Sequence, residues 1–399
     1  MKKISVICAT PSHSNPGMFS VDLAFHVLCR RHRLPAVVRH RCLEDPPDSE
    51  VSNVGLPFRY ESFRGDLESI YDSDLIVFWG DFLHAWPYHF FDVAQRFVNT
   101  GGYAQQADAL PLIYEHLMLS AAAPEVLEKT LIFGGTVLLN DVRHYGLEGY
   151  GPAAARLFAG ARCIWMRDVH SAAQIARARQ DFERSYLGVD CALLLRRDDI
   201  DALAPVSATS DAQDGSRLGV FFGRTKGDHT ALVHFARELA GRLGMKPEWV
   251  HWFGMPAKHL DVVKTLCPEL VVPERPAVWS GAFTALRRCR FVVTDTYHLS
   301  LLAWRLGIPA VCVGRASEHA NRTINDKKKE IFYYTYGAKL FYVFAEWLAD
   351  GAARRKIVDD LAGFLPNQAI TEAIIRAIDV HAEHSERQFV DECRAVLGV

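Results

Sequence analysis

The sequence lacks the motifs that usually mark a metal, disulfide or nucleoside-triphosphate site. Its nine cysteines are scattered and odd in number, and no Cys-x-x-Cys pair occurs, which argues against a zinc site and a disulfide framework. No His-Glu-x-x-His pattern is present, and the Gly-Lys-Ser/Thr spacing of a P-loop is missing. No Ser-His-Asp order is convincing either. We therefore expect no metal and no disulfide chemistry.

An excess of charge and a long apolar run are also missing. Lysine and arginine number 45 against 47 acidic residues, so the net charge of −2 does not favour nucleic acid as a partner. No stretch approaches the length of a transmembrane helix. The opening residues, MKKISVICATPS, are more typical of a first β-strand than of a signal peptide. We expect a soluble, cytoplasmic protein, and peripheral association with a membrane stays open.

The sequence does contain a repeated alternation of apolar strands and amphipathic helices, and residues 341–348 are among the segments predicted as helix. With 399 residues, 49% of them hydrophobic, two domains are the natural expectation. Residues 197–217 are rich in Asp, Ala, Ser and Pro and are predicted to be the linker. We predict the α/β class with two Rossmann-like domains, an N-terminal domain at 1–200 and a C-terminal domain at 216–370, followed by a helical segment at 371–399.

The most informative stretch is FVVTDTYHLSLLAWRLGIPAVCVG, residues 291–314. Apolar runs on either side of a helical pattern predict a strand–turn–helix–strand unit of a parallel sheet. The polar turn then lies at the carboxyl end of a strand, where open α/β sheets bind ligands. Within it, His298 is either a proton donor or anion ligand, or a helix-start histidine bonded to a backbone carbonyl. Asp295 either caps the helix or orients His298.

Cationic side chains follow other predicted strands of the C-terminal domain. Arg224 and Lys226 lie in the glycine-flanked turn GRTKG, which suits a phosphate or carboxylate, although a solvated basic turn is the simpler interpretation. Lys327 and Lys328 belong to a three-lysine run that is predicted mainly as a solvated helix face. One of these lysines, or Arg315 before them, could reach a bound anion.

Polar residues also follow the predicted strands of the N-terminal domain. Asn15 comes after the first strand, Asp81 and His84 after FWG, and Arg167 after CIWM. Asp168, next to Arg167, or Ser171 is predicted to be a helix cap. Each of these loops could equally face an interdomain cleft.

Taken in order, these motifs resemble the polysaccharide pyruvyl transferase family over most of the chain. The matching features are Asn15 and Gly17, the Trp79-Gly80-Asp81 turn, the Arg167-Asp168-x-x-Ser171 stretch, Asp190, Arg224, and the tract from Phe291 to Val313. The resemblance implies a fold of the two-domain glycosyltransferase-B type. It also implies transfer of the enolpyruvyl group of phosphoenolpyruvate onto a sugar of a cell-surface glycan or its precursor, as a ketal and without a cofactor. The acceptor would be a sugar or a lipid-linked oligosaccharide.

One position departs from the family pattern. The family turn reads Arg-apolar-His, whereas this chain has Thr296-Tyr297-His298, so the arginine that helps to grip phosphoenolpyruvate is missing. Carried over residue by residue, the resemblance implies His298 and Asp295 as catalytic residues. With the candidates after other predicted strands added, we predict donor binding by Arg224, Lys226, Thr296, Arg315, Lys327 and Lys328, and acceptor binding by Asn15, Asp81, His84 and Arg167. Arg315 and the lysines are candidates to replace the missing arginine. A nucleotide-sugar glycosyltransferase and a non-catalytic glycan-binding relative remain as alternatives.

Overall fold

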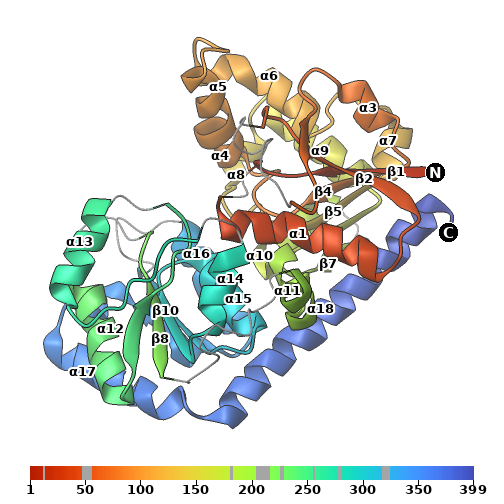
Figure 1. The fold of residues 1–399 in the computed structure, drawn as a ribbon. Coiled ribbons are helices and arrows are strands. Elements are labelled where there is room, and N and C mark those ends of the chain that lie inside the picture. The colour runs from red at the N-terminus through yellow and green to blue at the C-terminus, as the bar shows by residue number, and fades with distance from the viewer. Residues whose placement is uncertain are drawn as a thin grey trace. The chain divides into compact units, whose positions relative to one another are not determined.

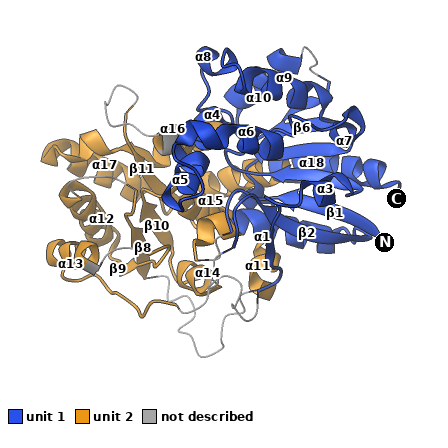
Figure 2. Cartoon of the chain, turned by 90° about the horizontal axis from the view of Figure 1, so that it is seen from above, with its two compact units in different colours: residues 1–12, 20–194, 381–399 blue, residues 13–19, 195–380 orange. Residues whose placement is uncertain are grey.

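The chain folds into two α/β units, each built around its own parallel sheet (Figure 1). The computed structural model describes residues 1–11, 14–46, 56–179, 183–203, 216–224, 229–254, 257–276, 280–316 and 324–399. Unit 1 comprises Met1–Ser12, Ser20–Leu194 and His381–Val399, and unit 2 comprises His13–Phe19 and Leu195–Val380 (Figure 2). The predicted α/β class with two Rossmann-like sheets is confirmed.

Unit 1 contains a seven-stranded parallel sheet in the order β3-β2-β1-β4-β5-β6-β7. Its strands are β1 (Lys2–Ile7), β2 (Ala36–Cys42), β3 (Tyr60–Ser62), β4 (Leu75–Trp79), β5 (Thr130–Gly135), β6 (Cys163–Met166) and β7 (Ser185–Leu187). The helices before its last strand are α1 (Pro16–Arg31), α3 (Leu67–Tyr71), α4 (Trp86–Tyr88), the π-helix η1 (His89–Ala94), α5 (Gln95–Asn99), α6 (Gln106–Leu117), α7 (Pro124–Glu128), α8 (Val142–Tyr145), α9 (Tyr150–Gly160) and α10 (Val169–Arg179). After β7 comes the 3-10 turn η2 (Cys191–Leu194). Every residue of β4, β5 and β6 is buried, as expected for central strands covered by helices on both faces.

Unit 2 contains a five-stranded parallel sheet in the order β12-β11-β10-β8-β9. Its strands are β8 (Arg217–Phe221), β9 (Lys246–Trp249), β10 (Phe291–Thr294), β11 (Ala310–Gly314) and β12 (Tyr342–Phe344). The helices are α11 (Arg197–Leu203), α12 (Thr230–Leu243), α13 (Ala257–Leu266), α14 (Ser280–Arg287), α15 (Tyr297–Arg305), α16 (Ile324–Thr335) and α17 (Gly351–Phe364), with 3-10 turns η3 (Lys339–Phe341) and η4 (Ala345–Leu348) beside β12.

The last helix, α18 (Gln368–Leu397), contributes to the core of unit 1 through its C-terminal half. Phe389 is fully buried and its ring lies 5.4 Å from that of Trp79 and 4.9 Å from that of Phe133. Glu386 accepts a hydrogen bond from Arg31 at 2.7 Å. The unit boundary therefore falls within α18. Another boundary falls within α1, whose first residues, up to Phe19, belong to unit 2.

One prediction about local structure is wrong. Residues 341–348, predicted as helix, form strand β12 between two 3-10 turns, because the aromatic run of Tyr342–Phe344 pairs with β11. The predicted linker begins with helix α11, and its residues 204–215 lie outside the described residues. Among the helices that the structure describes, none is long and apolar enough to cross a membrane.

Candidate functional site

The sheet order of unit 2 places its candidate site at one point of the carboxyl edge. Counted from β8, the order β9-β8-β10-β11-β12 is 2-1-3-4-5, so the direction of winding reverses between β8 and β10. Ligands of doubly wound sheets bind outside the carboxyl ends of the strands at such a switch point. The turn with Arg224 follows β8, and the turn with Asp295 and His298 follows β10. The topology therefore brings together candidates that are far apart in the sequence.

Asp295 ties these two turns together. One carboxylate oxygen accepts a hydrogen bond from the Gly223 N–H (2.8 Å), and the other accepts from the Arg224 N–H (2.9 Å). The side chain is fully buried, and a buried carboxylate is stable only when its oxygens are hydrogen-bonded. These contacts give Asp295 a positioning role, because both of its oxygens are engaged by the backbone of the β8 turn.

Thr296 is the N-cap residue of α15 and is almost completely buried. Its hydroxyl donates to Asp295 at 3.2 Å, and its N–H donates to the Thr294 hydroxyl at 3.1 Å. The hydroxyl proton is thus directed to Asp295, which leaves only oxygen lone pairs for other partners. This arrangement favours a structural role for Thr296 in the turn over the predicted contact with an anionic donor.

His298 lies in the first turn of α15 and is 8% exposed. The backbone of Gly17, in the first turn of α1, packs directly against it. A Cβ placed on Gly17 would lie 2.8 Å from the Cβ of His298 and 3.0 Å from its Nδ1. The Asn15 side-chain oxygen accepts from the Gly17 N–H at 3.1 Å and so caps α1. Two helix N-termini therefore meet around the imidazole, and their N–H dipoles favour a negative charge there.

The three consecutive lysines of α16 have different environments. The Lys328 ammonium lies 4.8 Å from the ring centroid of Tyr297, whose ring is 5.1 Å from that of His298. Lys329 is buried and donates to the carbonyls of Asp295 (3.0 Å) and Val313 (2.8 Å). Lys327 is exposed. Lys328 is thus the lysine of this run that lies beside the histidine turn, whereas Lys329 holds strand ends together.

The remaining predicted donor residues lie around the same sheet edge. The guanidinium of Arg224 is exposed and lies 4.8 Å from the ring centroid of Phe253, which follows β9. Arg315 is half-buried directly after β11. Lys226 lies outside the described residues.

Three further residues, which the sequence did not assign to the site, lie near the turns after β8 and β9. His259 bonds through Nε2 to the carbonyl of Phe222 (2.9 Å), and its ring lies 4.4 Å from that of His229. Arg275 lies next to Gly254, where a Cβ would be 3.5 Å from the guanidinium. These side chains come from distant segments, so no spacing in the sequence indicates them. Within the described residues, no group of three or more His, Cys, Asp or Glu side chains could hold a metal ion.

Two predicted acceptor residues of unit 1, Asp81 and Arg167, lie at the carboxyl edge of its sheet, whose switch point falls between β1 and β4. Asp81 follows β4 with a positive φ of 50°, a strained conformation for a non-glycine residue. Arg167 follows β6, is buried, and donates to Asp190 at 2.9 Å. Its other terminal nitrogen lies 4.0 Å from the Asp81 carboxylate. The structure thus groups Asp81, Arg167 and Asp190, all three carried over from the family resemblance.

His84 lies in the core of unit 1 and is 2% exposed. Its ring packs against those of Phe78 and Phe158, at 4.7 and 6.0 Å. Burial, with a smaller contribution from His89, lowers the pKa of His84 to about 3, so its ring is neutral at physiological pH. The imidazole is therefore not at the surface where an acceptor would bind.

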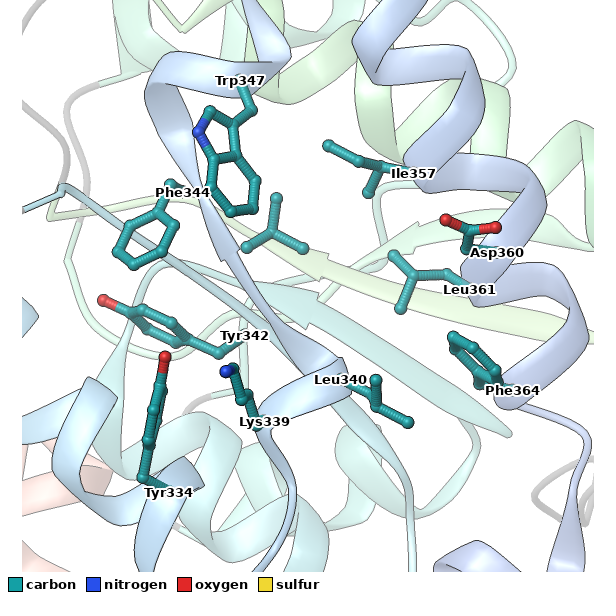
Figure 3. A pocket seen from close by; sticks show the side chains of 11 residues that line it. Tyr334, Lys339, Leu340, Tyr342, Phe344, Trp347, Ile357, Asp360, Leu361 and Phe364 are labelled. Atoms are coloured by element: carbon teal, nitrogen blue, oxygen red, sulfur yellow. The ribbon is translucent and has the colours of Figure 1, made fainter.

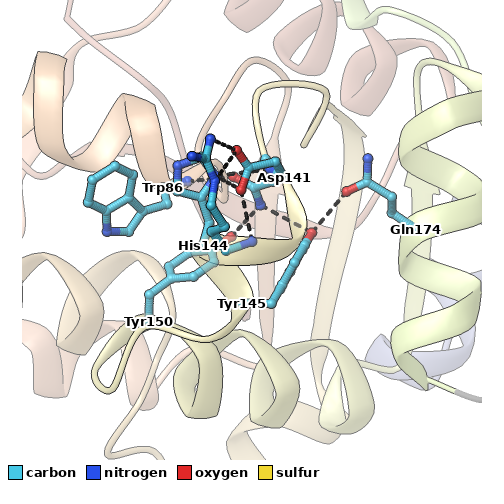
Figure 4. A network of polar contacts seen from close by, with 8 residues as sticks. Trp86, Asp141, His144, Tyr145, Tyr150 and Gln174 are labelled. Atoms are coloured by element: carbon cyan, nitrogen blue, oxygen red, sulfur yellow. Dashed lines mark hydrogen bonds and ion pairs between the residues drawn. The ribbon is translucent and has the colours of Figure 1, made fainter.

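The loop after β4 is held by a network of polar contacts (Figure 4). The Tyr150 hydroxyl donates to the carbonyl of His84 at 2.6 Å and receives a hydrogen bond from the Asn140 amide at 2.6 Å. Asn140 accepts from the Trp86 N–H at 2.9 Å. The ring of Trp86 is stacked on that of His144 at 4.7 Å. These contacts hold the backbone of the loop in place, and they do not indicate a ligand.

Asp168 confirms the predicted helix cap. Its carboxylate accepts from the Ser171 N–H and hydroxyl, both at 2.8 Å, and from the Thr136 hydroxyl at 2.6 Å. The Arg-Asp-x-x-Ser stretch is therefore the start of α10 joined to the end of β5, in which Arg167 and Asp168 have separate structural partners.

Solved structures with a similar fold include an epimerase bound to UDP-GlcNAc, a protein bound to UDP and a glycosyltransferase. The UDP-GlcNAc 2-epimerase of Neisseria meningitidis, bound to UDP-GlcNAc, has a TM-score of 0.56 and 9% identity, over 98% of this chain and 99% of that one. S. aureus MnaA with UDP has a TM-score of 0.58 and 10% identity, over 100% and 97%. The calicheamicin glycosyltransferase CalG4 has a TM-score of 0.51 and 14% identity, over 100% and 98%. At such identities the likeness concerns the fold, which confirms the glycosyltransferase-B type.

The sequence itself matches a family more specifically. None of the curated proteins that were compared matches the chain. The family model of polysaccharide pyruvyl transferase matches residues 30–317, which is more than half of the chain and includes the switch point of unit 2 between β8 and β10. Such a family implies a transferase with a sugar acceptor. With the fold and the histidine turn described above, the match shows that this chain belongs to the polysaccharide pyruvyl transferase family.

Proposed function

We propose that the protein transfers the enolpyruvyl group of phosphoenolpyruvate onto a sugar and forms a pyruvate ketal. The observation that carries the proposal is the environment of His298. The imidazole lies at a sheet switch point, between two helix N-termini, with the Lys328 ammonium against the neighbouring Tyr297 ring. A site for a small molecule with a carboxylate and a phosphate needs convergent positive potential of this kind.

The reaction assigns definite tasks to the side chains. A proton must be added to the methylene carbon of phosphoenolpyruvate, while a sugar hydroxyl adds to the neighbouring carbon and loses its proton to a base. A second hydroxyl of the sugar then displaces inorganic phosphate, which completes the ketal. Since an imidazole can give and take a proton near neutral pH, His298 is suited to one of these proton transfers or to binding the donor anion.

The missing family arginine is offset by other cations in this proposal. Lys328 and Arg224 supply charge at the two sides of the switch point, and Asp295 fixes the backbone from which Arg224 projects. Thr296 occupies the N-cap position of α15 and contributes no charge. The acceptor residues remain a prediction, with Asp81 and Arg167 at the carboxyl edge of the unit 1 sheet as the candidates.

A phosphate-release assay tests the proposal. Purified protein is incubated with phosphoenolpyruvate and a panel of nucleotide- and lipid-linked sugars, and free phosphate and the ketal are measured. His298→Ala should lower turnover by a factor on the order of 10² to 10⁴, the usual range for loss of a general acid or base. His298→Gln keeps a hydrogen-bond donor but transfers no proton, so near-normal turnover in that variant would assign binding alone. Near-normal turnover in the alanine variant would make the turn structural.

A nucleotide-sugar glycosyltransferase is the second candidate, because solved structures of this fold contain UDP or UDP-GlcNAc. A thermal-shift comparison separates the two. Protection by UDP-sugars, with none by phosphoenolpyruvate, would replace our proposal. A glycan-binding relative without activity would bind oligosaccharides and turn over neither donor. The assay includes this outcome because the family arginine is replaced by Thr296.

A further inference from the structure

A groove of about 330 Å³ lies in unit 2 between the edge strand β12, with its flanking turns, and helix α17 (Figure 3). The wall from β12 and its flanking turns is mainly aromatic, and α17 contributes two aliphatic side chains, one aromatic and one acidic. The lining residues are Tyr334, Lys339, Leu340, Tyr342, Val343, Phe344, Trp347, Ile357, Asp360, Leu361 and Phe364. The groove is separate from the histidine turn, and no residue assigned above to donor or acceptor binding lines it.

Large apolar side chains are exposed to water around this groove. Trp347 is 52% exposed, Tyr334 47% and Leu340 51%. Most tryptophans that the structure describes are instead buried, and Trp79 and Trp304 are examples. Apolar side chains that gather at one exposed place mark a binding surface more often than a defect of packing. Trp347 is therefore better explained by a ligand than by the core.

The aromatic wall is held in place by ring-to-ring contacts. Trp347 lies edge-on to Phe344 with centroids 4.8 Å apart, and Phe344 lies edge-on to Tyr342 at 5.4 Å. Because the side chains of the aromatic wall are already ordered, they lose little conformational freedom when a ligand binds. Figure 3 shows these rings along one side of the groove, with the side chains of Ile357 and Leu361 on the other.

Polar groups of both charges complete the lining. The Lys339 ammonium lies 5.1 Å from the Tyr334 ring centroid, and Asp360 lies on the α17 wall, where it receives a hydrogen bond from Lys356 at 2.8 Å. Aromatic rings suit the C–H faces of a sugar, while a carboxylate and an ammonium suit its hydroxyls. An anionic ligand would need cations in excess, and a lipid chain would need no charged partners. The lining thus fits a neutral saccharide.

The groove is connected to the edge of the sheet that carries the candidate donor site. Glu346, next to Trp347, accepts from the Ala316 N–H at 3.1 Å, directly after β11. Tyr342 donates to the carbonyl of Asp326 at 3.2 Å, at the start of α16. The aromatic wall and the lysine-bearing helix are therefore fixed to each other within unit 2.

We propose that this groove is a second saccharide site, which holds a sugar unit of the acceptor other than the one that is modified. The proposal rests on the proposed function in so far as the acceptor is a polymer of sugars. A saccharide that is held at two sites binds more tightly than either site alone would bind it, because the second contact forms at a high effective concentration.

The test measures saccharide binding without any donor. Wild type, Trp347→Ala and Trp347→Phe are titrated calorimetrically with neutral gluco-, galacto-, manno- and N-acetylglucosamine oligosaccharides of two to six units. We expect binding by wild type, a loss of roughly tenfold or more in affinity in Trp347→Ala, and near-wild-type affinity in Trp347→Phe, which keeps a ring. Val262→Ala removes an exposed apolar side chain of α13 that does not line the groove, so it is the matched control and should bind as wild type does.

Two other outcomes overturn the groove proposal, and a third overturns only the proposed reaction. Equal affinity of wild type and Trp347→Ala, or no binding of any oligosaccharide at millimolar concentration, would exclude a saccharide site in the groove. A wild-type dimer that Trp347→Ala dissociates in sedimentation, without an effect on sugar binding, would assign the groove to contacts between copies of the chain. Oligosaccharide binding that depends on Trp347, together with no phosphate release from phosphoenolpyruvate, would refute the proposed reaction and leave the groove assignment standing.

Discussion

Replacing Gly17 with alanine tests the geometry around His298. The new Cβ would lie 2.8 Å from the Cβ of His298, whereas carbon atoms in ordinary contact are about 3.5–4.0 Å apart. The overlap of roughly 1 Å cannot be relieved by a rotamer change, because the Cβ of His298 is fixed by the backbone of α15. The first turns of α1 and α15 must therefore separate, and a misplacement of about 1 Å at a reacting group lowers the rate by about 10²-fold.

The expected change in stability is much smaller than the change in rate. Alanine in a helix is favoured over glycine by about 0.5–1 kcal/mol, while overpacking costs about 1–3 kcal/mol. The two effects partly cancel, so the net destabilisation of Gly17→Ala lies between about zero and 2.5 kcal/mol, or a few degrees in Tm. The variant should thus be folded, with phosphate release from phosphoenolpyruvate lowered about 10²-fold.

Gly241→Ala is the matched control. Gly241 is also a helical glycine, in α12, and nothing lies within 4 Å of the position its Cβ would take. This variant should gain about 0.5–1 kcal/mol and keep full activity. The assay compares phosphate release and thermal unfolding of both variants with wild type. If Gly17→Ala behaved like Gly241→Ala, the close packing of Gly17 on His298 would be refuted.

Two further predictions follow from charges. Lys328→Ala and Arg224→Ala should each weaken the binding of phosphoenolpyruvate, measured as thermal protection, roughly ten- to a hundredfold, because each removes one charge-assisted contact. Lys327 is exposed, so Lys327→Ala should leave this binding unchanged. Equal effects of the two lysine variants would contradict the assignment of Lys328. In unit 1, burial raises the pKa of Asp22 to about 7, although the Tyr60 hydroxyl donates to it at 2.6 Å. The folded state then binds the Asp22 proton more tightly than the unfolded state does. The protonated carboxyl therefore makes its full contribution to the free energy of unfolding below about pH 4, and this contribution is lost as the pH rises to about 7. Urea unfolding of wild type and Asp22→Asn should therefore differ increasingly in favour of the variant over that range, and a constant difference would show that Asp22 does not titrate there.

The features that the sequence predicted depend on short segments. The alternation of apolar runs and helices predicted parallel sheets, and the turn from Asp295 to His298 was recognisable because strand, turn and helix are consecutive. The segment from 341 to 348 misled the prediction, since a short aromatic run satisfies helical and strand patterns alike. The segment Tyr342–Phe344 forms a strand because it pairs with β11, a contact that the local pattern does not reveal.

The geometry of the site required information that no single segment contains. The partners of Asp295 at Gly223 and Arg224 are more than 70 residues away, and the glycine that packs on His298 comes from the first turn of α1. The lysines of α16 look equivalent as a run. The side chains of successive helical residues point about 100° apart. Which of the three lysines is buried therefore depends on which one faces the sheet, and in the structure this is Lys329.

The packing of Phe389 among Trp79 and Phe133 has a consequence for how the protein is made. The sheet of unit 1 is complete by Leu187, and its continuous segment ends at Leu194, yet the aromatic centre of its core lacks one ring until Phe389 has been synthesised. At ordinary rates of translation that interval lasts roughly 10–40 s. During this time the apolar faces of Trp79 and Phe133 have to be shielded in another way, and the last helix acts as the closing step of a unit whose other strands were synthesised first.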